Sequence, residues 1–155
     1  LMFKIFNYFT IIFFLMLGSA LSEILKPNET IVPKKVVKIQ LDGLKKNDYS
    51  YKDQGIEQTW EFAHPTNKIF TGPLDRFKEM IKGDSYKMLL NHKDHKINQV
   101  FSDENKVIFE VIVMDSEKKY YLFKWQVEKY LKKGPLQNCW LTTMVSAPIS
   151  LGSSI

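Results

Sequence analysis

The spacing of apolar residues changes once along this chain, near His92, and this change constrains the fold more than any other feature. Before His92, apolar side chains recur every three or four residues, which is the spacing of one helix face. After it they alternate, as on a strand with one buried face. Helices followed by strands with short connections predict an α+β fold, in which the helices cover one face of an antiparallel sheet.

Three or four helices are expected in the first part: three over residues 33–47, 56–64 and 73–82, and one more turn that Asp84-Ser85 can cap, running through Leu90. Pro33 suits the first turn of the earliest helix, and Gly83 follows the helix over residues 73–82 as a natural stop. The apolar positions that define these helices are Val37, Leu41 and Leu44, then Ile56, Trp60 and Ala63, then Leu74, Phe77 and Ile81.

Four strands joined by short turns are expected in the second part, over residues 95–101, 107–114, 121–128 and 137–147. The second of these strands is apolar on both faces, so it should lie in the centre of the sheet or have its outer face covered. The third alternates most clearly, with aromatic side chains on one face and charged or polar side chains on the other.

Residues 1–22 have the pattern of a secretion signal, with Lys4 before a short apolar run and small residues at its end. Cleavage is expected after Ala20 or Ser22, which predicts an exported protein, periplasmic or secreted. The alternative is an uncleaved membrane anchor over residues 5–21, although this run is at the short limit for crossing a bilayer. Only in that case would the protein be held in a membrane.

The remaining chain divides into a linker over residues 23–32, one domain over residues 33–150 and a short C-terminal tail over residues 151–155. The net charge is +5, with 22 basic and 17 acidic residues, and the lysines are scattered. This mixed surface argues against a nucleic-acid partner. Cys139 is the single cysteine, so no disulfide forms within the chain, and its apolar setting predicts a buried, inert thiol.

Four ordered motifs resemble a known family. They are Trp-Glu-Phe-Ala-His-Pro-Thr-Asn at 60–67, Thr-Gly-Pro-Leu-Asp-Arg-Phe at 71–77, Leu-Leu-Asn-His at 89–92 and Asn-Cys-Trp-Leu-Thr at 138–142. The chain is similar to an uncharacterised family of small domains of unknown function, from bacteria and photosynthetic eukaryotes, which resembles the nuclear-transport-factor-2-like cone fold. The resemblance implies helices packed on a curved four-stranded antiparallel sheet that encloses a pocket. Asn138 departs from the pattern, where a small residue, often Gly, is usual.

A hollow cone would be lined by aromatic side chains, and this chain is rich in them. The expected ligand is an apolar small molecule, and no cofactor is expected. The alternative is that these rings simply fill the core. The residues expected to line the site are Trp60, Arg76, Phe77, Phe123, Trp125 and Trp140.

Arg76 is the only arginine among 22 basic residues, which suggests a fixed contact for its planar guanidinium. We expect it to brace the loop that residues 64–72 are predicted to form, by a clamp to a carboxylate or to backbone carbonyls. Binding of an anionic ligand is the alternative role.

Three residues are the candidates for catalysis: Glu110, His92 and Asp94. Glu110 is the lone carboxylate on an apolar strand, where burial could make it a base, although it could equally lie at an edge or a dimer interface. His92 and Asp94 would share one face of a strand. No metal site is expected, because too few ligands converge on His92, Asp94 and His95.

These patterns favour an exported, non-enzymatic module that binds a small apolar ligand or a partner. The alternative is a hydrolase- or isomerase-type enzyme of the cone fold, which would use Glu110 or the His92/Asp94 pair. A weak homodimer is also expected, because Ile108, Ile112 and Met114 form a second apolar face on a strand whose first face is already apolar.

Overall fold

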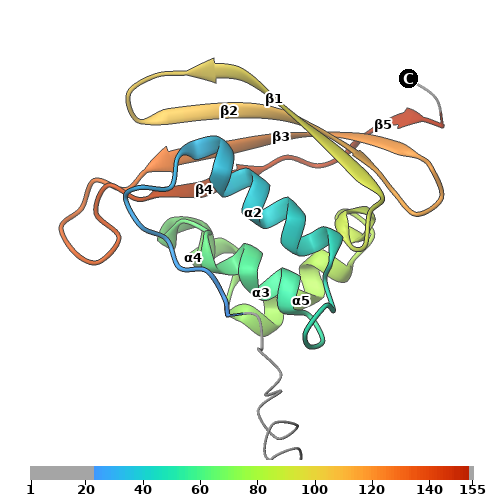
Figure 1. The fold of residues 1–155 in the computed structure, drawn as a ribbon, viewed down its shortest axis with the longest axis horizontal. Coiled ribbons are helices and arrows are strands. Elements are labelled where there is room, and N and C mark those ends of the chain that lie inside the picture. Colours follow the sequence, from blue (N-terminus) through green and yellow to red (C-terminus); the bar gives the residue numbers. More distant parts are fainter. Residues whose placement is uncertain (1–22, 154–155) are drawn as a thin grey trace, which may run out of the picture.

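A computed structural model describes residues 23–153, with a layer of helices on one side of a five-stranded antiparallel sheet (Figure 1). The α+β class expected from the sequence is confirmed. The expected secretion signal over residues 1–22 lies outside the described residues. Within residues 23–153, no helix is long and apolar enough to cross a membrane.

The helical layer contains four α-helices and one short 3₁₀ turn. They are α2 (Pro33–Lys45), α3 (Gln54–Glu61), α4 (Pro65–Thr71), α5 (Leu74–Lys82) and η1 (Lys87–Leu89). The helix α4 replaces the loop that was expected at residues 64–72, and that expectation was wrong. Pro65 occupies its first turn, and the ring Nδ1 of His64 accepts a hydrogen bond of 3.0 Å from the backbone N–H of Thr66. Histidine is not a usual N-cap residue, so Pro65 was the only start signal for this helix, and it indicated only the end of the helix before it.

The five strands are β1 (Asp94–Ser102), β2 (Lys106–Met114), β3 (Tyr120–Lys129), β4 (Trp140–Val145) and β5 (Ile149–Gly152). The sheet runs in the order β1-β2-β3-β4, and β5 also pairs with β3. The central position predicted for β2 is confirmed.

The expected last strand is split into β4 and β5, so the sheet has five strands rather than four, and it is not closed. The strand β4 pairs with the C-terminal half of β3, and β5 pairs with its N-terminal half. Pro148 lies between them and has no N–H to donate, so a continuous ladder is interrupted there. The boundary expected at residue 150 therefore falls within β5.

One continuous hydrophobic core lies between the sheet and α2. The residues of β2 and β3 that face it are all buried: Val107, Phe109, Val111, Val113, Phe123, Trp125 and Val127. The buried face of α2 packs against β1, β3 and β4. A domain with its own continuous core can in principle fold without the rest of the chain, and all of this core lies within residues 23–153. Cys139 is free and buried, as expected, and burial raises the pKa of its thiol.

The segment expected as a linker, residues 23–32, forms no helix or strand, but it is fixed to α3. The backbone N–H of Leu25 donates to Gln58 Oε1 at 2.8 Å, and Gln58 Nε2 donates to the carbonyl of Leu25 at 3.0 Å. Lys26 also pairs with Glu61 at 3.0 Å. These contacts bring the chain into the domain beside the end of α3.

Candidate functional site

A cavity of about 110 Å³ lies between the inner face of the sheet and the helical layer. Its walls come from α2, α3, α4, α5, the η1 region, β3 and β4. The side chains that line it are Gln40, Leu44, Thr59, Ala63, Asn67, Thr71, Phe77, Met80, Ile81, Tyr86, Leu89, Trp125, Thr142 and Val145. None of these residues carries a formal charge at neutral pH, so the cavity is neutral and mostly apolar.

A buried polar network, here called the glutamine network, forms one wall of the cavity. Gln40 Oε1 accepts hydrogen bonds from Trp125 Nε1 at 2.9 Å and from Thr142 Oγ1 at 2.7 Å. Gln40 Nε2 donates to the carbonyl of Thr59 at 3.0 Å. Gln40, Trp125 and Thr142 are each at most 2% exposed. The single donor of Trp125 is therefore already satisfied within the protein.

Polar groups also occur on the other walls, and most of them have partners in the chain. The hydroxyl of Tyr86 donates to the carbonyl of Val145 at 3.3 Å, and burial raises the pKa of Tyr86. Thr71 Oγ1 donates to the carbonyl of Asn67 at 3.1 Å. The cavity can therefore hold an apolar molecule without leaving a charged group of the protein desolvated.

Of the six residues expected to line a pocket, Phe77 and Trp125 do so. Phe123 is buried in the core, where its ring stacks on Tyr86 with centroids 6.5 Å apart. Trp60 and Trp140 are half-buried outside the cavity. The Nζ atom of a lysine lies over each of these two rings, Lys68 at 3.9 Å and Lys129 at 5.2 Å from the ring centroid.

The clamp expected at Arg76 does not occur within the described chain. Arg76 is exposed, and no hydrogen bond or ion pair joins it to residues 23–153. Its aliphatic part covers Gly72 instead: a Cβ at Gly72 would lie 2.6 Å from Arg76 Cδ. The φ angle of Gly72 is +79°, so this position favours glycine for the backbone as well as for space.

The three catalytic candidates lie away from the cavity. Glu110 is on the outer face of β2, opposite Lys124 of β3, because its neighbours Phe109 and Val111 occupy the inner face. Asp94 is exposed at the start of β1. The expected apolar outer face of β2 is present, and its residues are half-buried.

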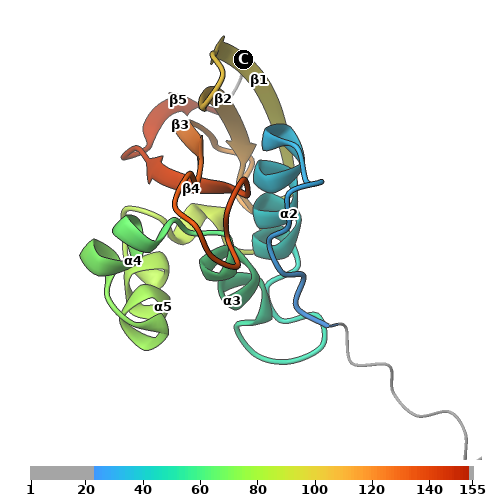
Figure 2. The ribbon, with the colours of Figure 1, turned by 90° about the vertical axis from the view of Figure 1, so that its left-hand side faces the viewer.

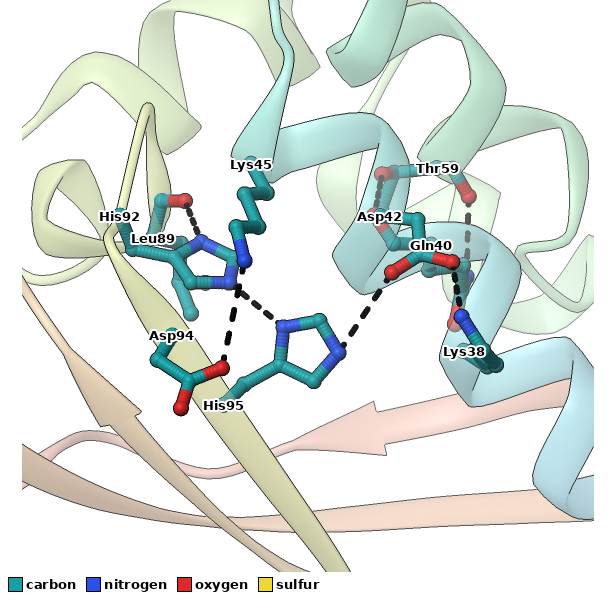
Figure 3. A network of polar contacts seen from close by, with 9 residues as sticks. All are labelled: Lys38, Gln40, Asp42, Lys45, Thr59, Leu89, His92, Asp94 and His95. Atoms are coloured by element: carbon teal, nitrogen blue, oxygen red, sulfur yellow. Dashed lines mark hydrogen bonds and ion pairs between the residues drawn. The ribbon is translucent and has the colours of Figure 1, made fainter.

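His92 belongs to a second polar network, here called the histidine network, which joins α2 to β1 (Figure 3). His92 Nδ1 lies 2.6 Å from the carbonyl of Leu89, so Nδ1 carries the proton and Nε2 is an acceptor. His95 Nδ1 lies 2.8 Å from His92 Nε2 and therefore donates to it. The far nitrogen of His95, Nε2, lies 3.6 Å from Asp42 Oδ1.

Burial disfavours the charged form of both histidines. It lowers the pKa of His92 to about 4, and it also lowers the pKa of His95, against the opposing effect of Asp42. Two ion pairs lie next to the histidines: Lys45 Nζ is 3.9 Å from Asp94 Oδ1, and Lys38 pairs with Asp42. Among residues 23–153, no group of three or more His, Cys, Asp or Glu side chains could hold a metal ion. The arrangement ties α2 to β1 and can accept protons in mild acid.

Comparison with protein families identifies the chain. The domain of unknown function DUF4864 matches residues 26–141. The chain belongs to this family. The DUF4864 match begins beside Leu25, includes all four described α-helices, and ends one residue before Thr142. No curated protein and no solved structure matches the chain.

Several residues of the DUF4864 cavity were not anticipated as site residues, chiefly Thr59, Asn67, Thr71 and Thr142. Gln40 carried a usable signal, because it is a glutamine within an otherwise apolar helix stripe. A polar group on a buried face needs a partner, so Gln40 indicated a polar network in the core. The threonines and the asparagine carried no comparable signal, since these residues are common on surfaces and in turns.

Proposed function

We propose that this DUF4864 domain is a binding module for one small, neutral, largely apolar molecule, held in the cavity between the sheet and the helices. The observation that carries the proposal is the chemistry of the walls, which combine apolar side chains with the internally satisfied glutamine network. A charged ligand would lose its hydration there without gaining a counter-charge. A neutral ring loses little hydration free energy on entering the cavity, and it buries apolar surface against Phe77 and Trp125.

The size of the cavity restricts the ligand to about one ring. An engineered apolar cavity of about 150 Å³ is known to bind benzene, and the cavity here has a volume of about 110 Å³. A sterol or a long acyl chain is far larger than this space. We therefore favour a single-ring compound or a short branched chain with at most one hydroxyl or carbonyl group.

We also propose that the domain is a form of the nuclear-transport-factor-2-like cone. Register shifts in the pairings of β1 and β3 support this, because such irregularities bend strands. The placement of α2 across the inner face supports it too, with the cavity between them. The proposal includes export, with cleavage after Ala20 or Ser22, which N-terminal sequencing of the exported protein tests. An intact N-terminus in a membrane fraction would contradict it.

The enzymatic alternative has less support. A cone-fold enzyme needs its acid or base in the cavity, where it can reach the substrate. Glu110, His92 and Asp94 are all absent from the lining of this cavity.

The outer sheet face supports a weak homodimer as a second property of the module. Ile112, Leu122 and Ile149 form an apolar row across three strands, and Glu110 lies opposite Lys124 next to this row. Under a two-fold axis, such a face can place its acid against the lysine of a second copy. Light scattering across a concentration series tests this: Ile112→Lys should abolish a dimer. A monomer at every concentration would contradict the proposal.

Melting experiments with matched pairs of small molecules test the binding proposal. Benzyl alcohol, which is neutral, should raise the melting temperature of residues 23–155, whereas benzoate and benzylammonium should not. At a hundredfold excess over the dissociation constant, the stabilisation should be about 2.7 kcal/mol. Ala63→Leu, which places extra carbons into the cavity, should remove the effect, and Ala147→Leu, at an exposed position, should keep it. Equal effects of the neutral and charged compounds would overturn the proposal.

A further inference from the structure

The helix α4 carries two large apolar side chains that nothing in the described chain covers. Ile69 is 78% exposed and Phe70 is 76% exposed, and α4 has no buried residue. Figure 2 shows α4 standing out from the body of the domain beside α5. Two adjacent apolar side chains of this exposure mark an interaction site more often than an ordinary surface.

The connection between β3 and β4 begins beside the N-terminal end of α4 and carries a third exposed apolar side chain. Tyr130, at its start, packs on the ring of His64, the N-cap of α4, with centroids 5.3 Å apart. The next residue, Leu131, is 60% exposed. We call the surface formed by Ile69, Phe70 and Leu131 the α4 patch.

Cations flank the α4 patch on both sides. Lys132 and Lys133 follow Leu131 and are exposed. Arg76 is exposed beyond the C-terminal end of α4, against Gly72, and it has no partner within residues 23–153. Two acidic residues of α5, Asp75 and Glu79, offset part of this charge, so anion recognition falls mainly to Lys132 and Lys133.

The inner side of α4 faces the cavity. Asn67 and Thr71 lie one helical turn apart and both line it, whereas Ile69 and Phe70 lie between them in sequence and are exposed. Ile69 therefore lies on the side of the helix opposite the cavity, and Phe70 lies on its exposed flank. A surface that takes up Ile69 and Phe70 is thereby brought next to one wall of the cavity.

We propose that the α4 patch docks the domain on the surface of an anionic membrane, with Ile69, Phe70 and Leu131 in the interface and Lys132 and Lys133 on the lipid headgroups. Apolar side chains beside cations are the combination that anionic bilayer surfaces bind. Docking brings the cavity wall to the bilayer, which dissolves small apolar molecules. The cavity ligand is then a molecule that partitions into membranes, and this last step rests on the proposed function.

The chain enters the domain beside the end of α3, and its charges reach α4. Lys26 pairs with Glu61 at 3.0 Å, and both charges act on Lys68 of α4. The apolar run over residues 5–21 precedes this entry point in the sequence.

Vesicle sedimentation with residues 23–155 tests the docking without any cavity ligand. The protein should sediment with phosphatidylcholine vesicles that contain phosphatidylglycerol, and added salt should weaken this binding. Ile69→Ser with Phe70→Ser should lower the partition coefficient by at least about tenfold. Val100→Ser with Phe101→Ser, at exposed apolar positions of β1, is the matched control and should leave it unchanged.

Charge variants and light scattering complete the test. Lys132→Glu with Lys133→Glu should reduce binding to the anionic vesicles, whereas Lys34→Glu with Lys35→Glu on α2 should reduce it less. Circular dichroism of each variant confirms folding. Absence of vesicle binding, or equal losses in the α4 and β1 variants, would overturn the proposal. So would self-association without vesicles that Ile69→Ser with Phe70→Ser abolishes, because the patch would then bind a second copy of the chain. Failure here leaves the melting experiments with benzyl alcohol unaffected.

Discussion

Two polar networks hold α2 against the sheet, and they differ in one respect that separates their roles. Gln40 and Asp42 are two residues apart on α2, but Gln40 is buried beside the cavity and Asp42 is exposed beside β1. The glutamine network contains no group that titrates near neutral pH. The histidine network contains His92 and His95, which are neutral at pH 7 and whose pKa values burial lowers, that of His92 to about 4.

The difference shows how one helix can serve a binding site and a structural contact at once. An uncharged, fully paired wall keeps the same hydrogen bonds across the physiological pH range, which suits a cavity for neutral molecules. Protonation of a buried, neutral histidine costs free energy. The hydrogen bonds that such a histidine makes are therefore weakened when the pH falls. The two networks should therefore respond differently to pH and to substitution.

The largest expected effect is a loss of stability in acid that originates in the histidine network. The pKa of His92 is about 4 in the folded protein and about 6.5 when unfolded, so between these values the unfolded state binds more protons. The free energy of unfolding should therefore fall as the pH drops from about 6.5 to about 4, by about 3 kcal/mol. Protonated His92 would also lose its acceptor role toward His95. Urea denaturation at a series of pH values measures this loss.

His92→Gln supplies the control for that titration. A glutamine can still donate to the carbonyl of Leu89 but does not titrate, so this variant should lose most of the acid dependence. Its stability at pH 7 is expected to be lower than that of the parent protein. If the two proteins lost equal stability between pH 6.5 and 4, the depressed pKa of His92 would be refuted.

A smaller effect, independent of pH, is expected from the glutamine network. Thr142→Val keeps the shape of the side chain but removes a hydrogen bond to Gln40 Oε1, at a cost of about 1–2 kcal/mol. Thr143→Val, next to it and only half-buried, should cost less. Denaturation at pH 7 and pH 5 should give the same difference from the parent. A cost that changed between these pH values would mean that the two networks are coupled.

The smallest effect is expected at Asp42. Its contact with His95 is 3.6 Å long and half-exposed, so Asp42→Asn should change stability by less than about 0.5 kcal/mol. Asp42 favours the protonated form of His95, so its removal should lower the pKa of His95 further. An NMR titration of the ring protons measures this shift, with His64 as an internal reference. A raised or unchanged pKa of His95 would contradict the geometry.

Much of the fold could be predicted from local patterns, and the failures have a common cause. The stripe of α2 and the double-sided apolar character of β2 are properties of neighbouring residues, and both expectations were confirmed. The helix α4 and the division of the last strand at Pro148 were missed. The start of α4 depends on an unusual N-cap, and the division of the last strand depends on its pairing with β3. Neither contact changes the spacing of apolar residues in the sequence.

The site was harder to predict, because it depends on which face of each strand turns inward. Phe109 and Glu110 are adjacent, and alternation alone cannot say which of them faces the helices. The helices cover the face of β2 that has no charge. Phe77 and Trp125, two of the residues expected beside a pocket, line the cavity, whereas Thr142 contributes through a hydrogen bond across 102 residues of sequence separation.

The most direct test of the account observes the three tryptophan indole N–H signals by ¹⁵N-correlated NMR during titration with benzyl alcohol. Trp125 lines the cavity and Trp60 and Trp140 do not, so the other two indoles are built-in controls. The account predicts a saturable shift of the Trp125 signal alone, which Ala63→Leu abolishes and which benzoate does not produce. Shifts of all three indoles, or a Trp125 signal that stays in place at saturating benzyl alcohol, would contradict a neutral ligand site in this cavity.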